Sequence, residues 1–111
     1  DGIVGVGGLR SRHEAMEAGE SGCDYVFFGN LQPPETPEVH ARNLDLAAWW
    51  APLFECPCVV LAGSEIGSVA DALATGAEFV ALRDAVWNHP EGPAAAIKAA
   101  NRLIADHREP A

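Results

Sequence analysis

Short apolar runs alternate with longer stretches of helical pattern along this chain of 111 residues. The runs are four to five residues long, the length of buried strands. Each stretch between them carries apolar side chains at helical spacing. Strands that alternate with helices predict a parallel sheet with right-handed crossovers, in the order βαβαβαβα. The four expected strands are Ile3–Val6, Tyr25–Phe28, Cys58–Ala62 and Phe79–Leu82.

One sequence unit occurs twice, as Gly22-Cys23-Asp24-Tyr25-Val26 and as Gly76-Ala77-Glu78-Phe79-Val80. Each copy follows a predicted helix, and glycine suits the left-handed position that ends a helix. The aromatic residue and valine that follow favour a strand buried on both faces. Four such strands are half the number in a (β/α)8 barrel, so we expect an α/β fold, a (βα)4 half-barrel, with residues 1–111 as a single domain.

Capping residues mark where the helices between the strands should begin and end. Ser11 and Glu14 have the spacing of a capping box, and the first helix should run to about Glu20. Asn43 is the predicted cap of the second helix, which Pro52 should end or kink. Ser64 or Ser68 should cap the third helix. Residues 30–43 form a long polar loop, which is uncommon in a compact domain unless it serves a function.

The composition narrows the classes of partner. Sixteen Asp and Glu against seven Lys and Arg leave a net charge of −9, which argues against a nucleic-acid partner. We find no apolar run long enough for a membrane span and no signal-peptide pattern. The first residue is Asp1, so we expect a piece of a longer or processed polypeptide. Cys23, Cys56 and Cys58 are interpreted as core residues of a reduced, cytoplasmic protein.

Ligands of parallel α/β folds gather at the carboxyl ends of the strands. Among the four strand-end segments, the third and fourth suggest a phosphate site: Gly63 allows close backbone approach, a helix start follows Ser64, and Arg83 could supply the cation. The alternative is equally open, because Gly63 could only make a turn and Arg83 could only pair with Asp84. No catalytic residue can be assigned.

Five further residues are candidates for a functional role. His13 is interpreted as a solvated helix residue rather than a catalytic base. His40 and Arg42, in the long loop, could reach a phosphate, although a solvated loop is the default reading. The pair Trp49-Trp50 is interpreted as helix packing or as a contact with another chain rather than a stacking site.

Three segments carry a resemblance to thiamine phosphate synthase and its thiazole tautomerase relatives: residues 22–29, 57–63 and 76–82. The resemblance implies a TIM barrel, of which this chain would be the C-terminal half. It also implies a magnesium-dependent transferase that joins hydroxymethylpyrimidine pyrophosphate to thiazole phosphate and releases pyrophosphate. Gly63 keeps the family's phosphate-facing glycine, whereas Arg83-Asp84 replaces its Val-Ser pair, and Thr36-Pro37 lies where the family has Thr-Lys.

These observations give two expected functions. The first is a thiamine phosphate synthase-like enzyme in which this chain supplies the phosphate-binding half, while the magnesium ligands lie outside the chain and the isolated chain is inactive. The second is a non-catalytic half-barrel for binding or assembly; another phosphate-binding barrel enzyme is a third possibility. The expected partners are a phosphorylated small molecule and either a second copy or a missing N-terminal half, with no nucleic acid and no membrane.

Overall fold

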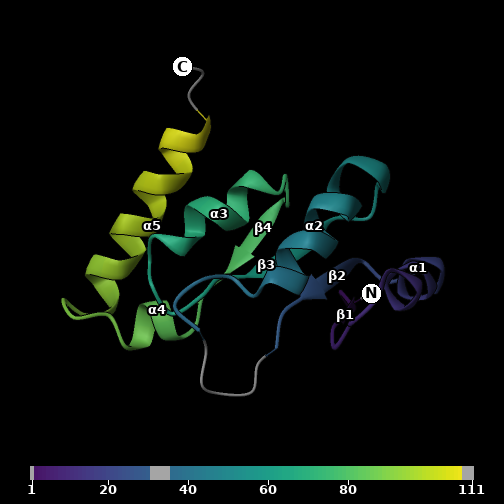
Figure 1. Ribbon diagram of the computed structural model, residues 1–111, viewed down its shortest axis with the longest axis horizontal. Helices are drawn as coiled ribbons and strands as arrows, with labels where there is room; N and C mark the ends of the chain where they lie inside the picture. The colour runs from purple at the N-terminus through teal and green to yellow at the C-terminus, as the bar shows by residue number, and fades with distance from the viewer. Residues whose placement is uncertain (1, 31–35, 109–111) are drawn as a thin grey trace.

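The computed structural model of the chain describes residues 2–30 and 36–108. Its strands form one parallel sheet in sequence order, β1-β2-β3-β4. Figure 1 shows β1 and α1 at one end of the sheet and α5 at the other. This arrangement of consecutive βα units confirms the predicted α/β half-barrel fold. The strands are β1 (Gly5–Val6), β2 (Tyr25–Phe28), β3 (Cys58–Leu61) and β4 (Phe79–Ala81).

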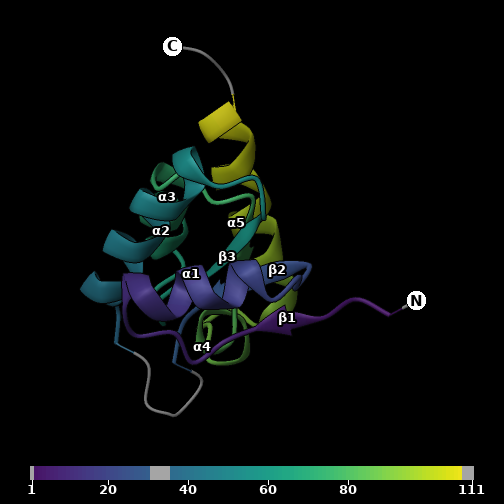
Figure 2. The ribbon, with the colours of Figure 1, turned by 90° about the vertical axis from the view of Figure 1, so that its right-hand side faces the viewer.

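The helices follow the strands in the predicted order, with one short addition. Helices α1, α2 and α3 pack against the strands, and α5 packs against α3 and α4. Figure 2 shows α2 and α3 on the same side of the sheet. The addition is α4, a single turn within a segment predicted as a strand-end loop. The helices are α1 (Arg12–Glu20), α2 (Ala41–Leu53), α3 (Ser68–Ala74), α4 (Asp84–Trp87) and α5 (Pro93–Arg108).

The predicted N-cap of the first helix is confirmed, and so are the helix stops at the glycines that begin the two repeated units. The Ser11 hydroxyl caps α1 by accepting the N–H of Glu14 at 3.2 Å. The Glu14 carboxylate reaches back one residue further than in a standard capping box, to the N–H of Arg10 at 2.7 Å. Gly22 and Gly76 have φ angles of 87° and 89°, the left-handed conformation expected where a helix stops.

Two predicted caps are wrong. The N-cap of α2 is His40, whose Nδ1 accepts the N–H of Arg42 at 3.2 Å, and Asn43 lies in the first turn of the helix. The N-cap of α3 is Gly67, without a side-chain bond. Ser68 begins that helix, and its hydroxyl donates to the Glu65 carbonyl at 2.6 Å instead of accepting an amide. Side chains that can donate or accept make these positions ambiguous from sequence.

The core lies between the sheet and its helices, so only one face of the sheet is fully covered. Val26, Phe28 and Val60 are fully buried there with Trp50, whose ring meets that of Phe28 edge to face at 6.2 Å. The buried Trp50 confirms the packing interpretation of the tryptophan pair.

The prediction of strands buried on both faces is wrong for the described structure. The register places Phe79 on the same face as Val59 and Phe27, opposite the face that the helices cover, and its side chain is 59% exposed. Ile3, predicted in the first strand, lies before β1 and is 81% exposed. The first strand is also shorter than predicted and begins only at Gly5. Tyr25 and Phe27 are half-buried on the second face, where the Tyr25 ring lies directly over Gly5.

Candidate functional site

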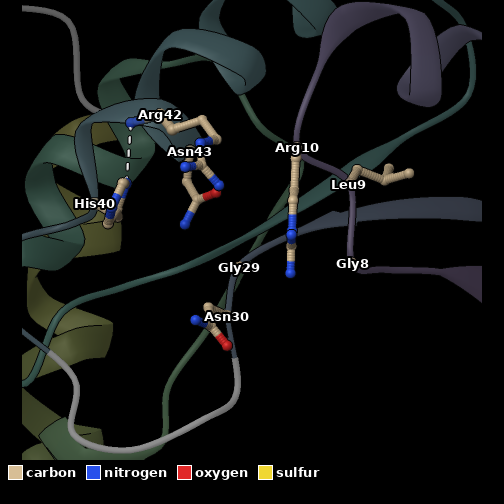
Figure 3. Close-up of a pocket in the computed structure, with 8 residues that line it drawn as sticks. All are labelled: Gly8, Leu9, Arg10, Gly29, Asn30, His40, Arg42 and Asn43. Carbon is tan, nitrogen blue, oxygen red and sulfur yellow. Dashed lines mark hydrogen bonds between the residues drawn. The ribbon is translucent and has the colours of Figure 1, made fainter.

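A cavity of about 190 Å³ opens at the carboxyl ends of β1 and β2. It is formed by the segment after β1, the segment after β2 and the first turn of α2, which the fold brings together from distant parts of the chain (Figure 3). Ligand sites of parallel α/β folds lie at this edge of the sheet. Its lining residues are Gly8, Leu9, Arg10, Gly29, Asn30, His40, Arg42 and Asn43.

The start of α2 supplies three of the eight lining residues: His40, Arg42 and Asn43. His40 precedes the helix, and its carbonyl accepts the N–H of Asn43 at 2.9 Å and that of Leu44 at 3.1 Å. Because His40 Nδ1 accepts the N–H of Arg42, the imidazole has only Nε2 left for a ligand. Asn43 is buried, whereas the Arg42 side chain is exposed beside it. The helix start adds a partial positive charge to this side of the cavity.

Arg10 supplies the second cation, from the loop after β1. Gly8, with a φ of 72°, turns the chain there, and the Glu14 carboxylate holds the N–H of Arg10. Figure 3 shows the Arg10 side chain extending between Gly8 and Gly29. Two guanidinium groups and an imidazole therefore line one cavity of an acidic chain. This arrangement favours an anion, because the guanidinium fork matches phosphate and carboxylate oxygens.

The sequence predicted two of the residues that line this cavity but not that they lie at one site. His40 and Arg42 were candidates, and the structure brings them to one site. Arg10, Asn30 and Asn43 were missed, although the first two follow predicted strands, which is the signal that could have found them. Leu31 to Glu35, in the same loop, lie outside the described residues.

The predicted phosphate site at Gly63 and Ser64 lies at the same edge of the sheet, after β3. A Cβ on Gly63 would lie 2.3 Å from the Pro37 carbonyl oxygen, so the loop before α2 packs directly on this glycine. The N–H of Ser64 donates to Thr36 at 2.8 Å, and that of Glu65 donates to Pro37 at 3.1 Å. A backbone segment does approach Gly63 closely, as predicted, but it is the loop before α2 and not a ligand.

Arg83, the third residue of that predicted site, follows β4. The N–H of Ala62 donates to the carbonyl of Ala81 where β3 and β4 end. The segment that contains Gly63 and the segment that contains Arg83 therefore lie next to each other at the same edge of the sheet. Arg83 Nε lies 3.5 Å from an Asp84 carboxylate oxygen, so the ion pair considered as the alternative is formed. This pair does not exclude an anion at Arg83, and the phosphate site stays a prediction.

The contacts of His13 and the burial of Cys58 account for these two residues without a ligand. His13 Nε2 lies 2.6 Å from the Glu17 carboxylate, one helical turn away, and both side chains are largely exposed. Cys58 is fully buried, and burial, followed by the charge of Glu78, raises the pKa of its thiol to about 12.

Within residues 2–30 and 36–108 there is no group of three His, Cys, Asp or Glu side chains that could hold a metal ion. Nor do the same residues include a helix with the length and apolar character needed to cross a bilayer.

Comparison with known proteins agrees with the resemblance. Residues 1–86 match the family described as thiamine monophosphate synthase. A thiamine-phosphate synthase of Rhodospirillum centenum is 43% identical over 105 residues, which cover 94% of this chain and 51% of that protein.

Two further relatives have the same name. The thiamine-phosphate synthase of Hyphomonas neptunium is 41% identical over 105 residues, covering 94% of this chain and 48% of that protein. That of Erythrobacter litoralis is 40% identical over 91 residues, covering 79% of this chain and 43% of that protein. The chain thus spans about half the length of these relatives. With the match over residues 1–86, the parallel βα units and the strand-end cavity, the chain belongs to the thiamine monophosphate synthase family.

Proposed function

We propose that this chain serves a thiamine-phosphate synthase reaction by binding the phosphate groups of the substrates. The observation that carries this proposal is the cavity between β1, β2 and α2, where Arg10, His40 and Arg42 line one space. The relatives named thiamine-phosphate synthase support the reaction class. The reaction we propose joins hydroxymethylpyrimidine pyrophosphate to thiazole phosphate and contributes to thiamine biosynthesis.

Arg10 and Arg42 would act on the pyrophosphate. When the bond between the hydroxymethyl carbon and the pyrophosphate oxygen breaks, negative charge develops on the departing pyrophosphate, and fixed cations nearby stabilise that charge. The thiazole nitrogen then forms the new bond to that same methylene carbon of the pyrimidine substrate. His40 Nε2 can donate to a phosphate oxygen in the neutral Nε2–H tautomer, the form in which Nδ1 accepts the N–H of Arg42.

The family implies magnesium, but the residues around this cavity do not fit that ion. Magnesium prefers carboxylate, carbonyl and water oxygens in octahedral geometry. The cavity instead presents guanidinium and imidazole groups, together with the amide side chains of Asn30 and Asn43. This cavity is therefore not a magnesium site.

The second proposed anion site is the one around Gly63, Ser64 and Arg83. It would hold the phosphate of the thiazole substrate, provided that the loop carbonyls of Thr36 and Pro37 release the amides of Ser64 and Glu65. We also propose the cytoplasm as its location, since free cysteines suit a reducing compartment.

Binding of pyrophosphate to the chain tests the proposal. Calorimetry with inorganic pyrophosphate should show binding that Arg42→Ala or Arg10→Ala weakens roughly tenfold, as expected for loss of a charged hydrogen bond. Arg102→Ala, at an exposed position of α5, is the matched control and should bind like the unaltered chain. Equal binding by all four proteins would contradict the assignment.

A second candidate function is assembly without catalysis. The exposed side chains Ile3 and Val4 before the β1 edge favour it, since open apolar edges are surfaces for pairing. Under both functions we expect the isolated chain to form no thiamine phosphate, so only an observed turnover would decide against assembly without catalysis. Formation that Arg42→Ala abolishes would show that the chain is catalytically complete.

A further inference from the structure

Two cysteines from different βα units lie side by side at the amino-terminal edge of the sheet. Cys23 stands two residues before β2, and Cys56 stands two residues before β3, its paired neighbour. Because Val26 pairs with Cys58, Cys56 lies one residue out of step with Cys23. Adjacent strands run about 4.8 Å apart, so such a diagonal pair stays within the Cα separation that a disulfide spans. The thiol of Cys56 donates to the Cys23 carbonyl at 3.8 Å. We propose that Cys23 and Cys56 form a thiol pair that a peroxide converts into an intramolecular disulfide.

Access to this pair comes from a cavity outside the candidate phosphate sites. The cavity, of about 270 Å³, lies between α1 and the end of α2, with Met16, Trp50, Phe54 and Cys56 among its lining residues. Both cysteines are half-buried, so a small oxidant can reach Cys56 from solvent. The Trp50 indole N–H donates to the Cys56 carbonyl at 2.7 Å and holds the backbone of this residue in place.

The rate of disulfide formation depends on how much of the Cys56 thiol is deprotonated. Burial is the largest cause that raises the pKa of this thiol, followed by the charge of Cys23 and a hydrogen bond with its side chain. Asp24 and Glu78 raise it further. Because the thiolate is the nucleophile, the pair should oxidise slowly at neutral pH and faster as the pH rises.

The chemistry needs one peroxide molecule for each disulfide. The Cys56 thiolate attacks one peroxide oxygen and the O–O bond breaks, which leaves a sulfenic acid and hydroxide; the hydroxide takes up the proton that the thiol had released and becomes the first water. The Cys23 sulfur then attacks the Cys56 sulfur, forms the S–S bond and releases the second water with its proton. Two thiols lose two electrons, and hydrogen peroxide is reduced to two waters.

Oxidation of the purified reduced chain tests the proposal. After treatment with hydrogen peroxide at mildly alkaline pH, the chain is unfolded and its free thiols are blocked with N-ethylmaleimide. The sequence has three cysteines, so intact mass should show three maleimides on the reduced chain and one on the oxidised chain. Peptide mapping should join Cys23 to Cys56 and place the maleimide on Cys58, and dithiothreitol should restore three.

Variants separate the proposed pair from general oxidation. Cys23→Ser and Cys56→Ser should each lose the intramolecular bond, whereas Cys58→Ala should keep it. Oxidation of Met16, the single methionine, adds oxygen that dithiothreitol does not remove and is therefore distinguished by mass. Three blocked thiols after peroxide treatment, a bond that includes Cys58, or a bond between two chains would overturn the proposal.

Discussion

The backbone N–H of Ser64 donates to the carbonyl oxygen of Thr36 across 2.8 Å. This bond, with its neighbour from Glu65 to Pro37, fastens the segment before α2 to the turn after β3. The amides that could bind a phosphate are thus the same ones that anchor the loop. The loop and an anion would compete for the amides of Ser64 and Glu65. Since the same loop leads into His40 of the first cavity, binding at one proposed anion site would affect the other.

Phosphate titration should reveal that competition. We expect millimolar phosphate to shift the NMR signals of the Ser64 and Glu65 amides together with those of residues 36–38, because the loop must give up its bonds as the anion binds. Arg83→Ala should weaken the effect through loss of a charged partner, and Arg102→Ala should leave it unchanged. Amides of Ser64 and Glu65 that stay still would mean that Gly63 makes only a turn.

Gly63→Ala should destabilise the fold. Its Cβ would lie 2.3 Å from the Pro37 carbonyl oxygen and 2.5 Å from the Glu38 backbone, so main chain must shift. Overpacking of this kind costs about 1–3 kcal/mol in the free energy of unfolding, measurable by urea titration. The matched control is Gly67→Ala, since nothing lies within 4 Å of a Cβ there. Equal losses in both variants would show that the loop packing contributes little.

Alkaline pH should weaken the fold through Cys58. Burial raises the pKa of this thiol from its ordinary value of 9.0 to about 12, so the folded state holds the proton more tightly than the unfolded state. The associated stability is complete below pH 9 and is lost as the pH rises through the window from 9 to 12, up to about 4 kcal/mol.

Urea unfolding across this window measures the loss. Cys58→Ala is the control: it removes the titrating group and should show a flatter dependence on pH, although its stability at neutral pH falls because the core loses a sulfur. Parallel curves for the two proteins would contradict the role of Cys58.

Self-association should occur through the open strands. Ile3 and Val4 before β1 are 81% and 61% exposed, and Phe79 on β4 is 59% exposed. Exposed edges of this kind pair with other chains, so sedimentation at micromolar concentration should show species larger than a monomer. Phe79→Lys should shift the equilibrium toward monomer, whereas Ile97→Lys on α5 should not. A single monomeric species in the unaltered chain would count against the prediction.

Local sequence signals were sufficient for the order of the elements. Short apolar runs and glycines such as Gly22 and Gly76 act through a few neighbouring residues, so the βα repeat and the helix stops could be predicted. The match of residues 1–86 confirms the family that the repeated segments suggested. The caps at His40 and Gly67 escaped prediction because several neighbouring side chains could fill the same role.

Only the tertiary structure brought Arg10 to Arg42, since the two residues belong to different βα units and meet where parallel strands end at one edge. It also showed that the amides after Gly63 are held by the loop, a contact between segments that no local pattern encodes. The exposure of Phe79 was likewise decided in three dimensions: a strand sequence specifies apolar faces, but burial depends on what the rest of the fold places against them.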